Sequence, residues 1–262
     1  MRIYIICDME GISGIRRVEQ TQTAQADYLA TGRKFLTGDV NAAIAGAFDG
    51  GATEVIVNEW HGGSCHLLLD EADPRAQYER TAGGLEVLPA LSADFSGVFF
   101  VGCHAMAGTP KAFLDHTMND TVWYNYYVNG RRMGEIAQCA LIAGHFGVPM
   151  LMVTGDRAAC LEAHEFLGEQ VVTVAVKEAL NRSFARIISP VRSQEMIREG
   201  ACRAMGLAGQ LAPLTVDMPA TIRLEYTRTD YADTAATRRH VRRVDPRAVE
   251  ATVDSVLDVY PF

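Results

Sequence analysis

Short, continuous runs of apolar residues that alternate with longer helical segments constrain the fold of this chain more than any other feature. They predict strands at residues 2–7, 53–58, 97–102, 150–153 and 171–176. Spacing and composition predict helices near residues 24–48, 134–146 and 157–167. Strands that are apolar throughout need cover on both faces of their sheet. The alternation therefore predicts a mostly parallel sheet covered by helices, a Rossmann-like three-layer α/β fold.

The pattern changes after Pro190. A helix is predicted near residues 193–205, followed by a strand at 221–226 that alternates apolar and polar residues, a short helix and a strand near 248–253. This texture is typical of a smaller α+β unit. We predict an α/β metal-binding catalytic domain at residues 1–188 and a smaller C-terminal α+β domain at residues 189–262. One more strand, at 122–128, is expected to turn at Asn129-Gly130, a strong hairpin signal.

Composition excludes some classes of partner. The 262 residues include 24 Lys and Arg against 32 Asp and Glu, a net charge of -8, which argues against a nucleic-acid or anionic membrane surface. No apolar run approaches the roughly 20 residues that span a bilayer, so no membrane association is expected. The first strand leaves no room for a signal peptide, and the six cysteines are scattered without a C-x-x-C pair. We therefore expect a cytoplasmic protein with reduced thiols.

Acidic and imidazole side chains follow several of the predicted strands at the point where each strand ends. They are Asp8, Glu10, His61, His104 and, in the first turn of the next helix, Glu135. Ligands of open α/β sheets bind outside the carboxyl ends of the strands, so these side chains should share one rim. Two imidazoles and three carboxylates suit Zn²⁺, and also Mn²⁺ or Co²⁺. Two ions that share a bridging carboxylate would neutralise three acids better than one ion.

Each of these residues also has a simpler interpretation. A histidine after a strand is usually a packing or capping residue, and an acid there is often a solvated loop residue or a helix N-cap. Glu135 could merely favour a helix N-terminus through its charge. The coincidence of all five residues at one predicted rim favours the metal site.

These residues lie in stretches that resemble the D-aminopeptidase family, peptidase family M55. The matching stretches are D-M-E-G-I-S-G (8–14), E-V-I-V-N-x-x-H (54–61), G-C-H-A-x-A-x-T-P (102–110), D-H-T-M (115–118), N-G-x-x-x-G-E (129–135) and A-V-K-x-x-x-x-R (175–182). Their order and spacing hold over at least residues 1–190.

The resemblance implies two Zn²⁺ ions per subunit on the five residues named above, and it adds His116 as a catalytic histidine. On its own, His116 would be interpreted as a surface residue of an irregular loop. The resemblance also implies hydrolysis of the N-terminal peptide bond of short peptides, and we predict that a metal-activated hydroxide attacks this bond. The expected N-terminal residue is a D-amino acid such as D-Ala. It further implies a large ring-like homo-oligomer, for which a decamer is the candidate size.

The chain departs from the family pattern at Ile6, Trp60 and Cys103, which stand where small polar, Ser-like and Tyr-like residues are expected. None of these changes removes a ligand, but Trp60 and Cys103 could reshape the pocket. Lys177 and Arg182, after the last parallel strand, are candidates to bind the substrate's carboxylate, with a surface ion pair as the alternative. The basic run at residues 238–243 is expected to be a solvated or subunit-interface surface.

Three alternatives to an aminopeptidase stay open from the sequence. The same ligand types serve a dinuclear metal amidase or a phosphoesterase that acts on other small substrates. The third alternative is a non-catalytic peptide-binding protein.

Overall fold

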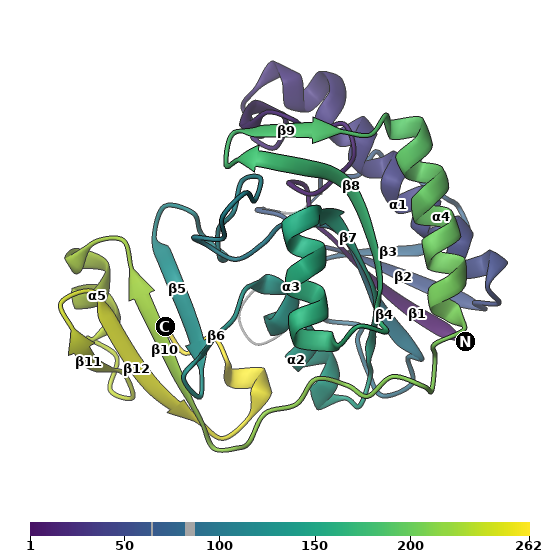
Figure 1. Cartoon of the computed structure of the whole chain (residues 1–262). Coiled ribbons are helices and arrows are strands. Elements are labelled where there is room, and N and C mark those ends of the chain that lie inside the picture. Colours follow the sequence, from purple (N-terminus) through teal and green to yellow (C-terminus); the bar gives the residue numbers. More distant parts are fainter. Residues whose placement is uncertain (64, 82–86) are drawn as a thin grey trace.

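The computed structural model describes residues 1–63, 65–81 and 87–262. Within these residues the chain forms two separate β-sheets (Figure 1). The larger sheet has seven strands in the order β3-β2-β1-β4-β7-β8-β9. They are β1 (Arg2–Cys7), β2 (Glu54–Glu59), β3 (Gln77–Arg80), β4 (Gly97–Cys103), β7 (Met150–Asp156), β8 (Val172–Asn181) and β9 (Phe184–Ile187).

All neighbouring strands of this sheet run parallel except β8 and β9, which form an antiparallel pair. Because the strands are parallel, the carboxyl ends of β1, β2, β4 and β7 meet at one edge. The prediction of a mostly parallel α/β sheet is confirmed.

Helices cover both faces of the larger sheet. They are α1 (Arg33–Asp49), α2 (Glu135–His145), α3 (Arg157–Leu167) and α4 (Pro190–Met205). Ile3 and Ile5 of β1 share one buried cluster with α1 and α4, whereas Tyr4 and Ile6 share the other with α2 and α3. Successive side chains of a strand point to opposite faces, so a strand with helices on both sides must be apolar at every position.

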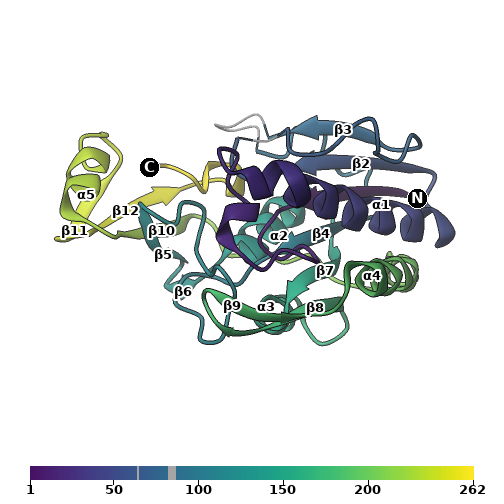
Figure 2. The ribbon, with the colours of Figure 1, turned by 90° about the horizontal axis from the view of Figure 1, so that it is seen from above.

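The smaller sheet has five strands in the order β11-β12-β10-β5-β6 and extends from one end of the main body (Figure 2). Its strands are β5 (Trp123–Val128), β6 (Arg131–Arg132), β10 (Ala220–Tyr226), β11 (Arg242–Asp245) and β12 (Ala248–Val253), and α5 (Thr229–Ala235) accompanies it. Its strand pairs are antiparallel.

The smaller sheet combines two distant parts of the sequence. β5 pairs with β10 in antiparallel register, with Tyr126 opposite Leu224. The sheet thus takes strands from both sides of residue 188, so the predicted boundary at 188/189 does not separate the two sheets. As a division into folding domains, it stays a prediction.

Short polar strands are the elements that the sequence pattern did not reveal. They are β3, β6, β9 and β11, each of at most four residues and largely exposed or half-buried. At such edge positions little apolar surface is buried, so no hydrophobic pattern marks them. The first predicted helical segment contains a π-helical turn at residues 28–32, which leads directly into α1.

None of the helices in the described part of the chain is both long enough and apolar enough to cross a bilayer.

Candidate metal centre

The segment that follows β1 carries two of the predicted ligands and stays attached to β4. The backbone N–H of Asp8 donates to Val101 O at 2.9 Å, and the N–H of Gly11 donates to Gly102 O at 2.8 Å. A Cβ atom on Gly11 would lie 2.0 Å from Cys103 O, a backbone atom. Only glycine allows this close approach of the two backbones.

Lys177, from β8, holds the same segment from the other side. Its buried Nζ donates to Glu10 O and to Ile15 O, each at 2.7 Å, and it lies 4.9 Å from the centre of the Phe113 ring. The ammonium group thus satisfies two backbone acceptors of the ligand-bearing segment.

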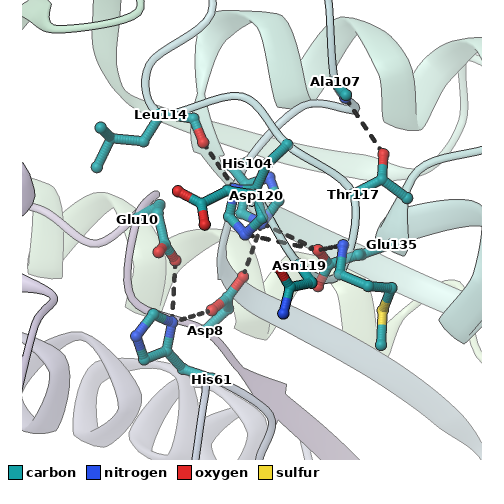
Figure 3. A network of polar contacts seen from close by, with 12 residues as sticks. Asp8, Glu10, His61, His104, Ala107, Leu114, Thr117, Asn119, Asp120 and Glu135 are labelled. Carbon is teal, nitrogen blue, oxygen red and sulfur yellow. Dashed lines mark hydrogen bonds and ion pairs between the residues drawn. The ribbon is translucent and has the colours of Figure 1, made fainter. Parts of the chain in front are cut away.

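Asp8 lies at the centre of the predicted cluster, between two imidazoles (Figure 3). Its Oδ1 is 3.0 Å from His61 Nδ1, and its Oδ2 is 3.3 Å from His104 Nε2. His61 Nδ1 is also 3.1 Å from Glu10 Oε2, and His104 Nε2 is 3.3 Å from Glu135 Oε1. The five side chains therefore form a chain of alternating acids and imidazoles, with one Asp8 oxygen on each side.

Backbone carbonyls hold the outer nitrogens of the two histidine rings, and the inward nitrogens face the carboxylates. His61 Nε2 lies 3.1 Å from Thr21 O, and His104 Nδ1 lies 3.1 Å from Ala105 O. A carbonyl oxygen only accepts, so each of these ring nitrogens carries the proton and donates. The opposite nitrogens, His61 Nδ1 and His104 Nε2, face the carboxylates, which is how metal-binding histidines are usually held.

Several buried atoms of the cluster make no hydrogen bond within the described residues. These are Asp8 Oδ2, Glu10 Oε2 and His104 Nε2. Three of the contacts given above, at 3.1 to 3.3 Å, involve these atoms, but none of them is a hydrogen bond. Buried polar atoms without a partner are costly, and a cation between these atoms would satisfy them. The residues present therefore fit a divalent metal site.

The electrostatics of the cluster also favour a cation. Burial alone would raise the pKa of Asp8, but the His104 and His61 imidazoles hold it well below its ordinary value. Burial alone would raise the pKa of Glu135, but the charge and hydrogen bond of His104, together with His116 and Trp60, lower it to about 2. Burial would lower the pKa values of His61 and His104, but the carboxylates beside them, Glu10 and Asp8 for His61 and Glu135 and Asp8 for His104, raise both well above the ordinary value. The acids are therefore ionised, and bound protons or a metal ion must balance their negative charge.

Two sets of side chains have ligand atoms close enough together to share an ion. One set is Asp8, Glu10 and His104, and the other is His104, His116 and Glu135; in each set the ligand atoms lie within 4.8 Å of one another. Both sets include His104, and His61 adjoins the first through Asp8.

His116 lies beside the metal ligands although it comes from an irregular loop. Its ring stacks on His104 with a centroid distance of 3.8 Å, and its Nε2 is 3.9 Å from Glu135 Oε1. Its Nδ1, 2.8 Å from Leu114 O, donates to that carbonyl. The other nitrogen, Nε2, is thus free to accept a proton next to the site.

Neighbouring groups hold Glu135 at the start of α2. Its Oε1 accepts from the backbone N–H of Met118 at 2.6 Å, and its Oε2 accepts from Trp60 Nε1 at 2.5 Å. Trp60, which departs from the family pattern, therefore orients a predicted ligand. The other two departures, Ile6 and Cys103, are buried in the apolar core, and burial raises the pKa of the Cys103 thiol well above its ordinary value.

A cavity of about 610 Å³ opens beside the cluster. Asp8, Glu10, His61, His116 and Glu135 line it.

The two predicted substrate contacts are placed differently. Arg182 lines the cavity, and its guanidinium group donates a hydrogen bond to the backbone oxygen of Asp115. The same group lies 3.3 Å from Asp115 Oδ1 and 3.6 Å from Asp120 Oδ2. Lys177 is not among the lining residues and binds the backbone instead.

The structure thus brings the five predicted ligands and His116 together. Sequence reasoning missed the hydrogen bond of Trp60, the backbone contacts of Lys177 and the aromatic residues of segment 259–262 at the cavity. No local pattern marks these three features, because each joins residues that are far apart in the chain.

Carboxylates and imidazoles gathered at the carboxyl edge of an α/β sheet, beside a cavity and a free histidine nitrogen, define a metal-dependent hydrolase. The family model of the M55 peptidases, described as D-aminopeptidase, matches residues 1–262. A curated D-aminopeptidase of Bacillus subtilis (strain 168) is 33% identical over 238 residues, which cover 90% of this chain and 85% of that protein.

A solved structure, the Zn-dependent D-aminopeptidase DppA from Bacillus subtilis, described as a self-compartmentalizing protease, superposes with a TM-score of 0.93. It is 30% identical, and the match covers 100% of this chain and 94% of that chain. The chain belongs to the M55 family of D-aminopeptidases, and the predicted enzyme class, a metallo-aminopeptidase, is confirmed.

Proposed function

We propose that this chain is a zinc-dependent D-aminopeptidase that removes N-terminal D-amino acids such as D-Ala from short peptides, with two zinc ions per subunit. The observation that carries the proposal is the position of Asp8, which directs one carboxylate oxygen toward each of two imidazoles, His61 and His104. Asp8 would hold the two ions together with Glu10, His61, His104 and Glu135. The same donors also accept Mn²⁺ or Co²⁺.

Zinc ions in this site would supply Lewis acidity, which polarises a carbonyl oxygen and lowers the pKa of a water molecule to about 7. The chain's own residues would provide the proton transfers. His116 presents Nε2 to the cavity, because Nδ1 is engaged with Leu114 O. That nitrogen would accept a proton from the attacking water and return it to the leaving amine.

The rest of the cavity would hold the ends of the peptide. The carboxylates of Asp8 and Glu10 line it and can attract the free α-amine, which would favour cleavage at the amino end. Arg182 also lines it and remains our candidate for the peptide's carboxylate. For Lys177 the proposed role is to position the ligand-bearing segment, because its Nζ is bound to Glu10 O and Ile15 O.

We also infer that the chain assembles into a ring-like homo-oligomer that encloses its active sites. The support is the relative described as self-compartmentalizing, with which this chain superposes over its full length. The size of the ring, a decamer, and a cytoplasmic location stay predictions.

The proposal is tested by metal analysis of the purified protein together with hydrolysis of D-Ala-D-Ala and L-Ala-L-Ala. We expect close to two equivalents of zinc and cleavage of the D-dipeptide. Replacing His104 by Ala should remove both activity and stoichiometric zinc, whereas His145→Ala, a change at an exposed histidine near the end of α2, should retain both. Full activity in the His104→Ala variant, or turnover of a phosphate ester with no turnover of a peptide, would contradict the proposal.

A further inference from the structure

Two chemically different groups of side chains line the cavity, the predicted metal ligands and a set of aromatic residues. The aromatic residues are Trp60, Trp123, Tyr260 and Phe262. We call these four residues the aromatic wall. They come from the loop after β2, from β5 and from segment 259–262.

Segment 259–262 is held in place beside the smaller sheet, near the end marked C in Figures 1 and 2. Tyr126 Oη donates to Val259 O at 2.6 Å. Arg238 Nη1 and His240 Nε2 lie 3.2 Å and 2.8 Å from Pro261 O, and both donate to it. The start of the basic run at 238–243 therefore anchors the segment that brings Tyr260 and Phe262 to the cavity.

Ring contacts hold two residues of the aromatic wall, Trp123 and Tyr260. Trp123 stacks on Tyr126 with a centroid distance of 5.8 Å and an interplanar angle of 8°. Tyr260 contacts both rings at 6.3 Å. Aromatic groups locked by their neighbours form a preorganised apolar surface, which binds a ligand with little loss of conformational entropy.

The aromatic wall begins next to the metal centre. Trp60 Nε1 donates to Glu135 Oε2 at 2.5 Å, so one member of the wall touches a predicted ligand. A peptide whose scissile bond lies at the ligands therefore has its nearest side chains within reach of the wall. The charged groups nearby, Arg182 and Asp120, lie 3.6 Å apart and pair with each other.

We propose that the aromatic wall binds a large apolar or aromatic side chain of the substrate, carried by one of the two residues that flank the cleaved bond. This inference rests on the proposed aminopeptidase function and narrows its substrates. An apolar pocket of this kind discriminates by size: a single methylene group changes kcat/KM by about 10-fold to 200-fold.

The test compares three dipeptides with the zinc-loaded full chain: D-Ala-D-Ala, D-Phe-D-Ala and D-Ala-D-Phe. We expect kcat/KM for one of the two Phe-containing peptides to exceed that for D-Ala-D-Ala by about 10-fold or more. The position of Phe in the better substrate shows which flanking residue the wall contacts.

Variants of the wall then test its role. The ratio to follow is kcat/KM for the better Phe-containing peptide divided by kcat/KM for D-Ala-D-Ala. Trp123→Ala and Phe262→Ala should each bring this ratio to within about threefold of one. Tyr124→Ala is the matched control, because Tyr124 is exposed on the same strand and is not among the lining residues, so it should keep the ratio. Circular dichroism confirms folding, and Phe262→Ala changes a half-buried residue that lies outside both sheets.

Equal kcat/KM values for the three peptides in the unmodified chain would overturn the inference and leave the proposed function standing. A preference that persists in both wall variants would also overturn it. Hydrolysis of none of the three peptides would overturn the proposed function and the inference together.

Discussion

Replacing Lys177 by Met removes the ammonium group that supports the ligand-bearing segment, and it keeps a side chain of similar length. In the structure, Lys177 Nζ donates to Glu10 O and Ile15 O, each at 2.7 Å, and faces the Phe113 ring at 4.9 Å. The side chain is only 2% exposed, so water cannot readily replace the lost donors. Methionine fills the space of the aliphatic stem, and the change should therefore report on the polar contacts rather than on a cavity.

The size of the effect follows from these contacts. A buried carbonyl left without a donor costs about 1–3 kcal/mol, which gives about 2–6 kcal/mol for the two acceptors. The buried charge of Lys177, however, is itself unfavourable to the folded state. Burial lowers the pKa of Lys177 to about 7, although Asp156, Asp39 and Glu10 raise it. Removing a poorly solvated charge therefore returns part of the loss. We expect the free energy of unfolding to fall by about 2–4 kcal/mol.

The change should also weaken metal binding, because Asp8 and Glu10 lie in the supported segment. Loss of a group that holds metal ligands in place typically lowers metal affinity by about 10-fold to 100-fold. Urea unfolding of the metal-free protein measures stability, and titration with zinc against a chelator measures affinity.

Lys34→Met, at an exposed lysine of α1, is the control for the loss of a positive charge. If Lys177→Met unfolds within about 0.5 kcal/mol of the unmodified chain and binds zinc equally well, the supporting role of Lys177 is refuted.

Three further predictions concern single residues near the site. Trp60→Phe keeps an aromatic ring but removes the donor to Glu135 Oε2; zinc affinity, measured by competition with a chelator, should fall by up to about 100-fold, and unchanged affinity would contradict the orienting role. Burial raises the pKa of Glu162 from 4.5 to about 7, so the folded state binds more protons than the unfolded state between these values. The contribution of Glu162 therefore lowers the free energy of unfolding by at most about 3 kcal/mol as the pH rises through that window. In the Glu162→Gln variant, the decrease in the free energy of unfolding between pH 5 and pH 8 should be smaller. Gly11→Ala would place a Cβ 2.0 Å from Cys103 O, so thermal unfolding should show a loss of about 3 kcal/mol or more, and a near-normal melting temperature would show that the two backbones can separate.

The apolar runs and the residues that end them carried most of the information about the fold and the predicted ligands. A parallel sheet brings the carboxyl ends of its strands to one edge, so locating the strands was enough to bring Asp8, Glu10, His61 and His104 together. Glu135 followed from its place in the first turn of α2. His116 could not be found this way, because it lies in a loop without periodicity, and only the resemblance to the family named it.

Tertiary contacts decided the features that the sequence pattern did not show. Lys177 and Glu10 are 167 residues apart, Tyr126 and Val259 are 133 apart, and Trp60 and Glu135 are 75 apart. β5 likewise joins the smaller sheet through β10, about a hundred residues later in the chain. Local periodicity reports which face of an element is buried, but not which distant group it meets there. For this protein, the sequence alone therefore determined the sheet and the edge where the ligands gather. Only the folded chain determined how those ligands are held and which aromatic side chains surround the space beside them.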